Sequence, residues 1–497
     1  MRFYQIIRPF FLSRWGTLFG IVCLISGSIY AAESSVLTLN QYLTKLIEVH
    51  PMVQLNETRY QKELRRLDAV SSISDWTLFG QSNVNKGAEL FGQFNQDTTQ
   101  FQTNMGISKL VSQTGTRLTL SGGYFIMKDP PSLSESMPFP NQYNAQVQFE
   151  IVQPLLKNMM GKLDQFPIQL SELEQRLAKI KYETDLNMFI QSHVNVYLEW
   201  VYAFRYLQIR RDQLTKANRQ FEIIARQSKT GVSDQSDYVL AEQNVMLSQM
   251  VVEEAAHAFR EKTRAILNDL GIQFEMDKRF IPDPNFRLDP PTVDLWTYLQ
   301  SASSVAKTFD VSNEMMNLSI DAAKVAMLPR LDLVGSITGL NNASSAGDMF
   351  SGQFENRESK LGFLFEYPLS NRKQKAAYQD AVLSKFETQL SHADEWAKIR
   401  FKVDALTLGL GLIETQLQTL TKVQFLSQKR AGLEKEKYNQ GRSQSLTFVI
   451  NAENTVLDNQ ISVLNLQFRQ YQLYNTQLAL TDAYARQFNN PSQRNAE

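Results

Sequence analysis

The sequence predicts an α+β membrane protein in which a helix–strand–long helix unit occurs twice. Three observations lead to this prediction. Motifs recur at a long interval, some segments alternate apolar and polar residues as β-strands do, and long uninterrupted stretches have the heptad spacing of packed helices. Two copies of so long a unit indicate a duplicated half-protein rather than a solenoid of short repeats.

The duplication is clearest where Gly-Val-Ser-Asp-Gln-Ser-Asp-Tyr-Val-Leu begins at Gly231. The segment Gly-Arg-Ser-Gln-Ser-Leu-Thr-Phe-Val-Ile begins 210 residues later, at Gly441, and Asn244 matches Asn454. Two further pairs of segments resemble each other: 38–43 with 294–299, and 149–155 with 365–369.

These matches define the expected domain organisation. We place repeat 1 at residues 32–271 and repeat 2 at 293–490. The stretch 272–292, which holds four prolines, is the expected linker, and 491–497 is a tail.

The first 31 residues have the features of an export signal. Arg2, Arg8 and Arg14 make its start positive, residues 15–32 carry no charge, and Ile29-Tyr30-Ala31 is an acceptable cleavage site. An uncleaved anchor is the alternative, because the uncharged run approaches spanning length. Small residues just before the cleavage site interrupt the apolar run and favour cleavage.

The composition excludes several classes of protein. Without the three arginines of the signal, the chain has 48 basic and 51 acidic residues. This net charge of −3 argues against a nucleic-acid binder. The one cysteine, Cys23, lies in the signal in a poor lipobox, so we expect no lipid anchor, disulfide or thiolate metal site in the mature chain. No later apolar run reaches spanning length, so a membrane crossing would require a closed β-barrel.

Each repeat contains segments that alternate like strands. We expect strands within about 76–153 in repeat 1 and about 331–368 in repeat 2. In 142–152 one face holds Tyr143, Ala145, Val147, Phe149 and Ile151, and the other holds Asn144, Gln146, Gln148 and Glu150. A barrel in lipid requires such faces, although a soluble sheet packed on a core has the same pattern.

Helices are expected before and after the strands of each repeat. Their ranges are 39–71 (interrupted at Pro51), 165–229 and 233–271 in repeat 1, and 293–327, 372–439 and 443–488 in repeat 2. The clearest heptad stripe is Ile399, Val403, Leu406, Leu410, Ile413, Leu417 and Leu420. Helices of this length must lie against other long helices.

The sequence offers no catalytic or metal-binding constellation. The four histidines are scattered, and no HExxH or Cys-His pattern occurs. Ser304-Val305-Ala306-Lys307 matches a bare SxxK pattern, but its partner motifs are lacking, so we interpret it as chance. We therefore predict that the protein is not an enzyme and uses no cofactor or metal.

Several motifs, in this order and spacing, resemble those of the TolC-like outer-membrane efflux and secretion channels. They are Leu37-Thr-Leu-Asn-Gln-Tyr-Leu, Gln153-Pro-Leu-Leu, Lys229-Thr-Gly, Leu328-Pro-Arg-Leu, Tyr367-Pro-Leu and Tyr438-Asn-Gln-Gly. The resemblance covers nearly the whole mature chain.

The resemblance implies a homotrimer in the outer membrane of a Gram-negative bacterium. Three chains would share one β-barrel in outer-membrane lipid, continuous with a long periplasmic α-helical barrel. Such a channel is a passive duct for tripartite efflux or type I secretion, and its partners are a periplasmic adaptor protein and an inner-membrane transporter. The sequence does not identify the cargo. The alternative is a secreted or surface coiled-coil protein with a structural or adhesive role and no pore.

One departure from the family concerns the strands. Family members usually have two strands per repeat, which gives twelve in the trimer. Repeat 1 here has an additional alternating hairpin across 100–127, with its turn at Gln113-Thr114-Gly115. This hairpin either enlarges the barrel or folds over it.

A second departure concerns the periplasmic aperture, which the resemblance places at the turns of Gly231 and Gly441. Many members have acidic residues six and nine positions after the second glycine, where they bind cations. Thr447 and Ile450 stand there in this chain, so we expect no acidic ring.

The resemblance also implies a contact between the two turns. Asp237, six residues after the first glycine, and Tyr438, three before the second, are retained. A hydrogen bond between them would help to hold the aperture closed. Alternatively, Asp237 is simply a favourable negative charge at a helix N-terminus.

Overall fold

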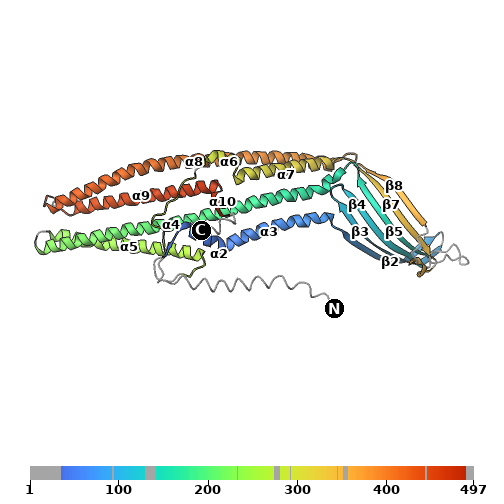
Figure 1. The fold of residues 1–497 in the computed structure, drawn as a ribbon, viewed down its shortest axis with the longest axis horizontal. Coiled ribbons are helices and arrows are strands. Elements are labelled where there is room, and N and C mark those ends of the chain that lie inside the picture. The colour runs from blue at the N-terminus through green and yellow to red at the C-terminus, as the bar shows by residue number, and fades with distance from the viewer. Residues whose placement is uncertain are drawn as a thin grey trace. The chain divides into compact units, whose positions relative to one another are not determined.

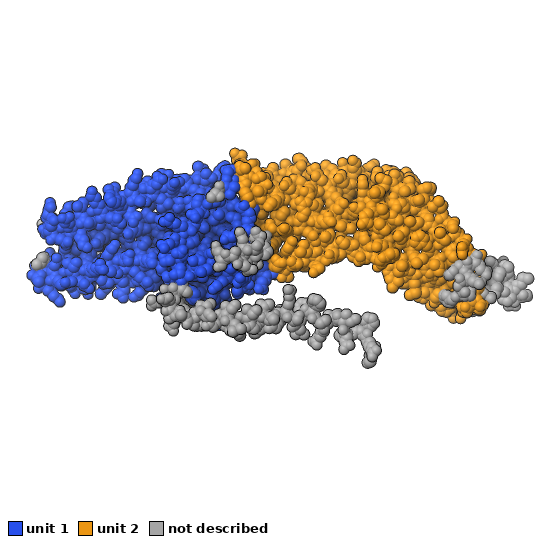
Figure 2. Space-filling view, in the orientation of Figure 1, with its two compact units in different colours: residues 1–54, 186–295, 403–497 blue, residues 55–185, 296–402 orange. Residues whose placement is uncertain are grey.

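The computed structural model describes residues 35–91, 94–128, 142–231, 233–273, 280–291, 293–343, 345–350, 356–442 and 445–488. The chain divides into two compact units (Figure 2). Unit 1 comprises residues 1–54, 186–295 and 403–497, and unit 2 comprises 55–185 and 296–402. Each unit therefore contains segments of both expected repeats. The expected export signal, most of the loop after the extra hairpin and the C-terminal tail lie outside the described residues.

Two short helices, strands, a long helix and a shorter helix follow one another twice along the chain (Figure 1), with four strands in the first series and two strands and one more final helix in the second. The first series is α2 (Leu39–Val49), α3 (Pro51–Ser71), β2 (Thr77–Phe91), β3 (Phe94–Val111), β4 (Thr116–Lys128), β5 (Gln142–Pro154), α4 (Lys162–Lys229) and α5 (Gln235–Asp269). The second is α6 (Leu295–Ser301), α7 (Ser304–Ala326), β7 (Arg330–Ala343), β8 (Asn356–Glu366), α8 (Arg372–Asn439), α9 (Thr447–Leu480) and α10 (Ala483–Phe488). One short strand precedes each series, β1 (Ser35–Leu37) the first and β6 (Phe280–Pro282) the second. Both long helices have 68 residues.

The expected helices are present, with two corrections. The interruption at Pro51 is confirmed, because proline has no N–H and is suited to the first position of α3. The expected helix 293–327 is two helices, because the Ser303 hydroxyl accepts a hydrogen bond from the Ala306 N–H (3.1 Å) and caps α7. The expected helix 443–488 is also two, because Asp482 has φ 52° and ends the first segment.

Within the described ranges, no helix is both long enough and apolar enough to cross a membrane.

In unit 1, α5 runs alongside the part of α4 that belongs to this unit (Figure 1). Tyr42, Tyr197 and Trp200 are completely buried in its main apolar cluster. The Trp200 indole N–H donates to the Thr263 hydroxyl at 2.8 Å, so the buried polar atom of the largest core side chain is satisfied.

The expected linker contacts this core. Its residues 280–282 form β6, which pairs in parallel with β1. The Tyr197 hydroxyl donates to the Leu37 carbonyl at 2.8 Å, and Arg205 donates to the Phe286 carbonyl at 2.9 Å. Three-residue strands are too short to show a period, so the sequence did not reveal this pair.

In unit 2, side chains join neighbouring helices. Gln175 of α4 donates to the Leu64 carbonyl of α3 at 3.0 Å, and Arg176 of α4 lies 2.6 Å from Glu314 of α7. Phe309 of α7 stacks on His392 of α8 with 3.9 Å between ring centroids. The helices of this unit therefore come from both repeats.

Helix α8 carries two apolar stripes. The predicted heptad stripe is its buried side, since Ile399, Val403 and Ile413 are all buried. A second stripe is exposed and includes Phe401 and Leu408, each 76% exposed. One chain therefore covers only one of the two stripes.

The six longer strands form one antiparallel sheet in the order β2-β3-β4-β5-β7-β8 (Figure 1). The hairpin expected at 100–127 is β3 and β4, with its turn at residues 112–115. It is paired with β2 on one side and β5 on the other, so it is an interior part of the sheet.

Candidate functional site: sheet faces and helix turns

The strand register aligns side chains of one kind in rows across the sheet. One row is apolar in five neighbouring strands, with Leu78, Ile107, Leu120, Phe149 and Ile337, and its sixth member, on the edge strand β8, is Ser359. The adjacent row lies on the opposite face and is polar: Thr77, Ser108, Thr119, Glu150, Ser336 and Lys360. The alternation expected for single strands therefore continues across the sheet.

The described residues leave the apolar face largely exposed. Leu78 is 77% exposed and Ile337 59% exposed, in different strands. On the edge strand β8 every residue is exposed, including Leu361 and Phe363. An exposed apolar surface that spans several strands marks a site of interaction with lipid or protein.

The two helix turns of unit 1 have the glycines that the sequence predicted. Gly231 has φ 72° and Gly441 has φ 67°. After α8 the Gly441 N–H donates to the Tyr438 carbonyl at 3.0 Å, and the Arg442 N–H donates to the Lys437 carbonyl at 2.9 Å. This pair of bonds is a Schellman motif, in which the left-handed position favours glycine.

A buried carboxylate links the two turns. Asp237, in the first turn of α5, accepts a hydrogen bond from the Tyr438 hydroxyl (2.9 Å) with one oxygen and from the Leu446 N–H (3.3 Å) with the other. The expected bond to Tyr438 is therefore confirmed. The structure shows more than a helix-terminal charge, because the carboxylate joins α5 to segments of the other repeat.

The Tyr438 hydroxyl is held in this network. Burial is the main cause that raises the pKa of Tyr438, and its hydrogen bond to Asp237 acts in the same direction. Ser233 lies 3.5 Å from the same hydroxyl. The phenol therefore stays protonated and remains a donor at physiological pH.

The structure separates the two residues expected at the aperture. Thr447 is the exposed first residue of α9. Ile450 is buried in a second apolar cluster (Ile224, Ala241, Leu446, Val449 and Ile450), which lies just behind the turns. Thr447 thus lies on the surface, whereas Ile450 supports the turn from inside.

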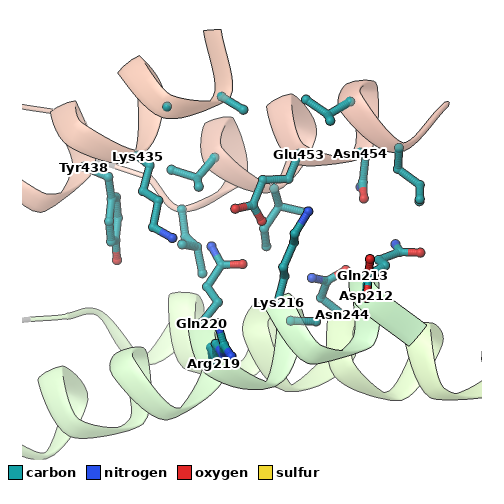
Figure 3. A pocket seen from close by; sticks show the side chains of 18 of the residues that line it. Asp212, Gln213, Lys216, Arg219, Gln220, Asn244, Lys435, Tyr438, Glu453 and Asn454 are labelled. Carbon is teal, nitrogen blue, oxygen red and sulfur yellow. The ribbon is translucent and has the colours of Figure 1, made fainter. Parts of the chain in front are cut away.

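Between the α4–α5 and α8–α9 pairs lies a cavity of about 440 Å³ (Figure 3). Asn244 and Asn454, the matching asparagines of the two repeats, both line it. Lys216, Lys435 and Glu453 also line it, and Figure 3 shows these three side chains approaching from both helix pairs. The duplicated segments therefore enclose a polar space together.

Glu453 was not recognised in the sequence, because it is one of many charged residues on a long helix. Burial raises the pKa of Glu453 above its ordinary value, while Lys435 and Lys216 act in the opposite direction. The duplicated Asn454 beside it was the only sequence signal for this region.

The raised pKa of Glu453 predicts a pH-dependent contribution to stability. An acid whose pKa is raised by folding stabilises the fold below its unfolded pKa, and this contribution is lost as the pH rises through the folded pKa. Glu453→Gln should therefore raise the melting temperature relative to the wild type at pH 8 but not at pH 4. Thermal unfolding at both pH values measures this, and an equal difference at both would contradict it.

Among the residues that the structure describes, no group of three or more His, Cys, Asp or Glu side chains is placed to hold a metal ion. Ser304 and Lys307, the first and last residues of the bare SxxK pattern, lie at the start of α7.

No known sequence family matches the chain, and no curated protein sequence does. Solved structures do match it. The outer membrane protein VceC of Vibrio cholerae has a TM-score of 0.63 and 13% identity, with 89% of this chain and 96% of that chain covered. The MtrE outer membrane channel of Neisseria gonorrhoeae, in its open state, has a TM-score of 0.63 and 13% identity, with 89% and 88% covered.

A third similar structure is CusC, described in connection with transmembrane channel formation. Its TM-score is 0.64 at 11% identity, with 91% of this chain and 95% of that chain covered. At such low identity the likeness establishes architecture. The chain has the fold of the TolC-like outer membrane channels, the family that its sequence motifs resemble.

Proposed function

We propose that three copies of this chain form a passive export duct in the outer membrane of a Gram-negative bacterium. The observation that carries the proposal is the match of 89% of the chain to the outer membrane protein VceC and to the outer membrane channel MtrE. In the proposed assembly the sheets form a β-barrel in outer-membrane lipid and the helices form a long periplasmic tube. A periplasmic adaptor and an inner-membrane transporter deliver the cargo.

The two-faced sheet supports this proposal. A barrel wall in a membrane has apolar side chains toward lipid and polar side chains toward water. The row that contains Phe149 provides an apolar face, and the row that contains Glu150 provides a polar face. A coiled-coil rod or adhesin, the alternative class, has no need of a six-stranded sheet with an exposed apolar face.

The exposed stripe of α8 supports the homotrimer. Phe401 and Leu408 are seven residues apart, which is the spacing of a helix packed against another helix. A neighbouring copy would cover this stripe in the periplasmic tube and would also pair with the edge strands β2 and β8, whose outer sides pair with no strand of the described residues.

The cellular location and assembly can be tested together. The mature protein should fractionate with the outer membrane and run, after detergent extraction, as a trimer that dissociates on heating. Recovery as a soluble periplasmic monomer would refute the proposed function.

The non-acidic aperture leads to a prediction about cation block. If Thr447 from three copies lines the periplasmic opening, Thr447→Asp adds three carboxylates there and should create block by divalent and trivalent cations. Thr455→Asp is the matched control, since Thr455 is exposed on the same helix two turns further on. Single-channel recording measures both variants. Strong block of the wild type from the periplasmic side would show that other acidic residues line the opening.

A further inference from the structure

The β3–β4 hairpin is built into the sheet over nearly its whole length. Strand β3 pairs with β2 from Phe94 to Ser108 and with β4 from Thr99 to Val111. Strand β4 pairs with β5 from Arg117 to Met127. The hairpin therefore separates β2 from β5, and neither strand could fold over the sheet without breaking two ladders of hydrogen bonds.

The faces of the hairpin match those of its neighbours. Ile107 and Leu120 are in the apolar row, between Leu78 and Phe149. Ser108 and Thr119 are in the polar row on the opposite face. A register shift of one residue would reverse these faces, so the hairpin has the pattern of the rest of the sheet.

The sheet is too small to close on itself and is suited to joining other copies. Six strands are fewer than the roughly eight whose interior is already filled by side chains, so one copy cannot enclose a channel. Among the described residues, no strand pairs with the outer edges of β2 and β8. Because successive strands are antiparallel and their number is even, β8 of one copy and β2 of the next would also meet antiparallel.

We propose that the hairpin forms part of the channel wall, so that three copies close an eighteen-stranded barrel, six strands from each. This inference rests on the proposed function. With strands about 4.8 Å apart and tilted by about 40°, eighteen strands give a backbone diameter of about 36 Å, whereas twelve give about 24 Å.

The greater width points to a class of cargo. Side chains on the inner wall leave a lumen of roughly 25 Å, which admits two α-helices of about 10–12 Å each side by side. At the outer membrane the channel would therefore pass polypeptides that retain helical structure as well as small molecules.

Spin-label distances between copies measure the barrel directly. Gln146 and Val147 are adjacent exposed residues on opposite faces of β5, so separate Gln146→Cys and Val147→Cys variants place labels inside and outside the wall. The mature chain is expected to have no other label site, because Cys23, the one cysteine of the sequence, lies in the signal. Averaged over the two positions, the distance between copies should be about 31 Å for eighteen strands and about 21 Å for twelve.

A deletion provides the matched comparison. Removing residues 94–128 leaves residues 92–93 and 129–141 to connect β2 to β5. The two strands are already antiparallel, with Leu78 and Phe149 in one row. The distance should fall by about one third, from about 31 Å toward about 21 Å.

The results separate this inference from the proposed function. A wild-type distance near 21 Å, or the same distance with and without the hairpin, would overturn the inference but leave the channel intact. If the deletion variant does not fold, the wild-type distance alone decides. If labels on the wild-type chain give no measurable spin-label distance between copies, the trimer is refuted, and with it the proposed function.

Discussion

Asp237→Ala is expected to loosen the periplasmic end of the channel and to raise its single-channel conductance. The change removes the acceptor of the Tyr438 hydroxyl and of the Leu446 N–H, at 2.9 and 3.3 Å. Leaving the buried Leu446 N–H without its acceptor costs about 1–3 kcal/mol. Because these bonds join the turns of the two repeats, we expect the loss to favour an open arrangement. Recording in planar bilayers measures the conductance.

Asp234→Ala is the control for this prediction. Asp234 is the N-cap residue of α5, is exposed, and its side chain makes no capping hydrogen bond. The Asp234→Ala change removes one negative charge from the same helix end as Asp237→Ala but leaves the hydrogen bond between Asp237 and Tyr438 intact. If both variants raise the conductance equally, the effect comes from the charge at the helix N-terminus and the hydrogen bond does not hold the aperture closed.

Gly441→Val should destabilise the turn after α8 by about 1–3 kcal/mol, because a β-branched residue does not readily adopt its φ of 67°. Gly231→Val should do the same after α4. A Cβ at either glycine would meet no atom within 4 Å, so the expected effect is one of backbone conformation alone. Faster amide hydrogen exchange at the turns and reduced export would be the result.

The control is Gly411→Val in the interior of α8. A Cβ there also meets no atom within 4 Å, but the backbone is helical. Valine is a better helix former than glycine, so this variant should not be destabilised. Equal damage at Gly411 and at the two turns would contradict the assignment of the turn motifs.

The elements with strong periodicity could be predicted from the sequence. The stripe through Ile399 and Val403 identified the buried side of α8, and alternation across 100–127 identified the extra hairpin. Recurrence of the Gly231 and Gly441 segments identified both turns. These features depend on local patterns, which a single sequence displays.

Features that depend on long-range contacts could not be predicted in the same way. Alternation alone did not decide whether the extra hairpin pairs within the sheet, because pairing depends on which strands lie beside it. The burial of Ile450 depends on packing against Ile224 and Ala241, far away in the sequence. The break before Ser303 is a local cap within an otherwise continuous apolar pattern.

Reconstitution of the purified protein in planar lipid bilayers tests the central claim most directly. If three copies form a transmembrane duct, the protein should insert and give discrete, reproducible conductance steps. Asp237→Ala should enlarge these steps, and Asp234→Ala should leave them unchanged. Well-folded protein that inserts without conducting, or that never inserts, would contradict the account.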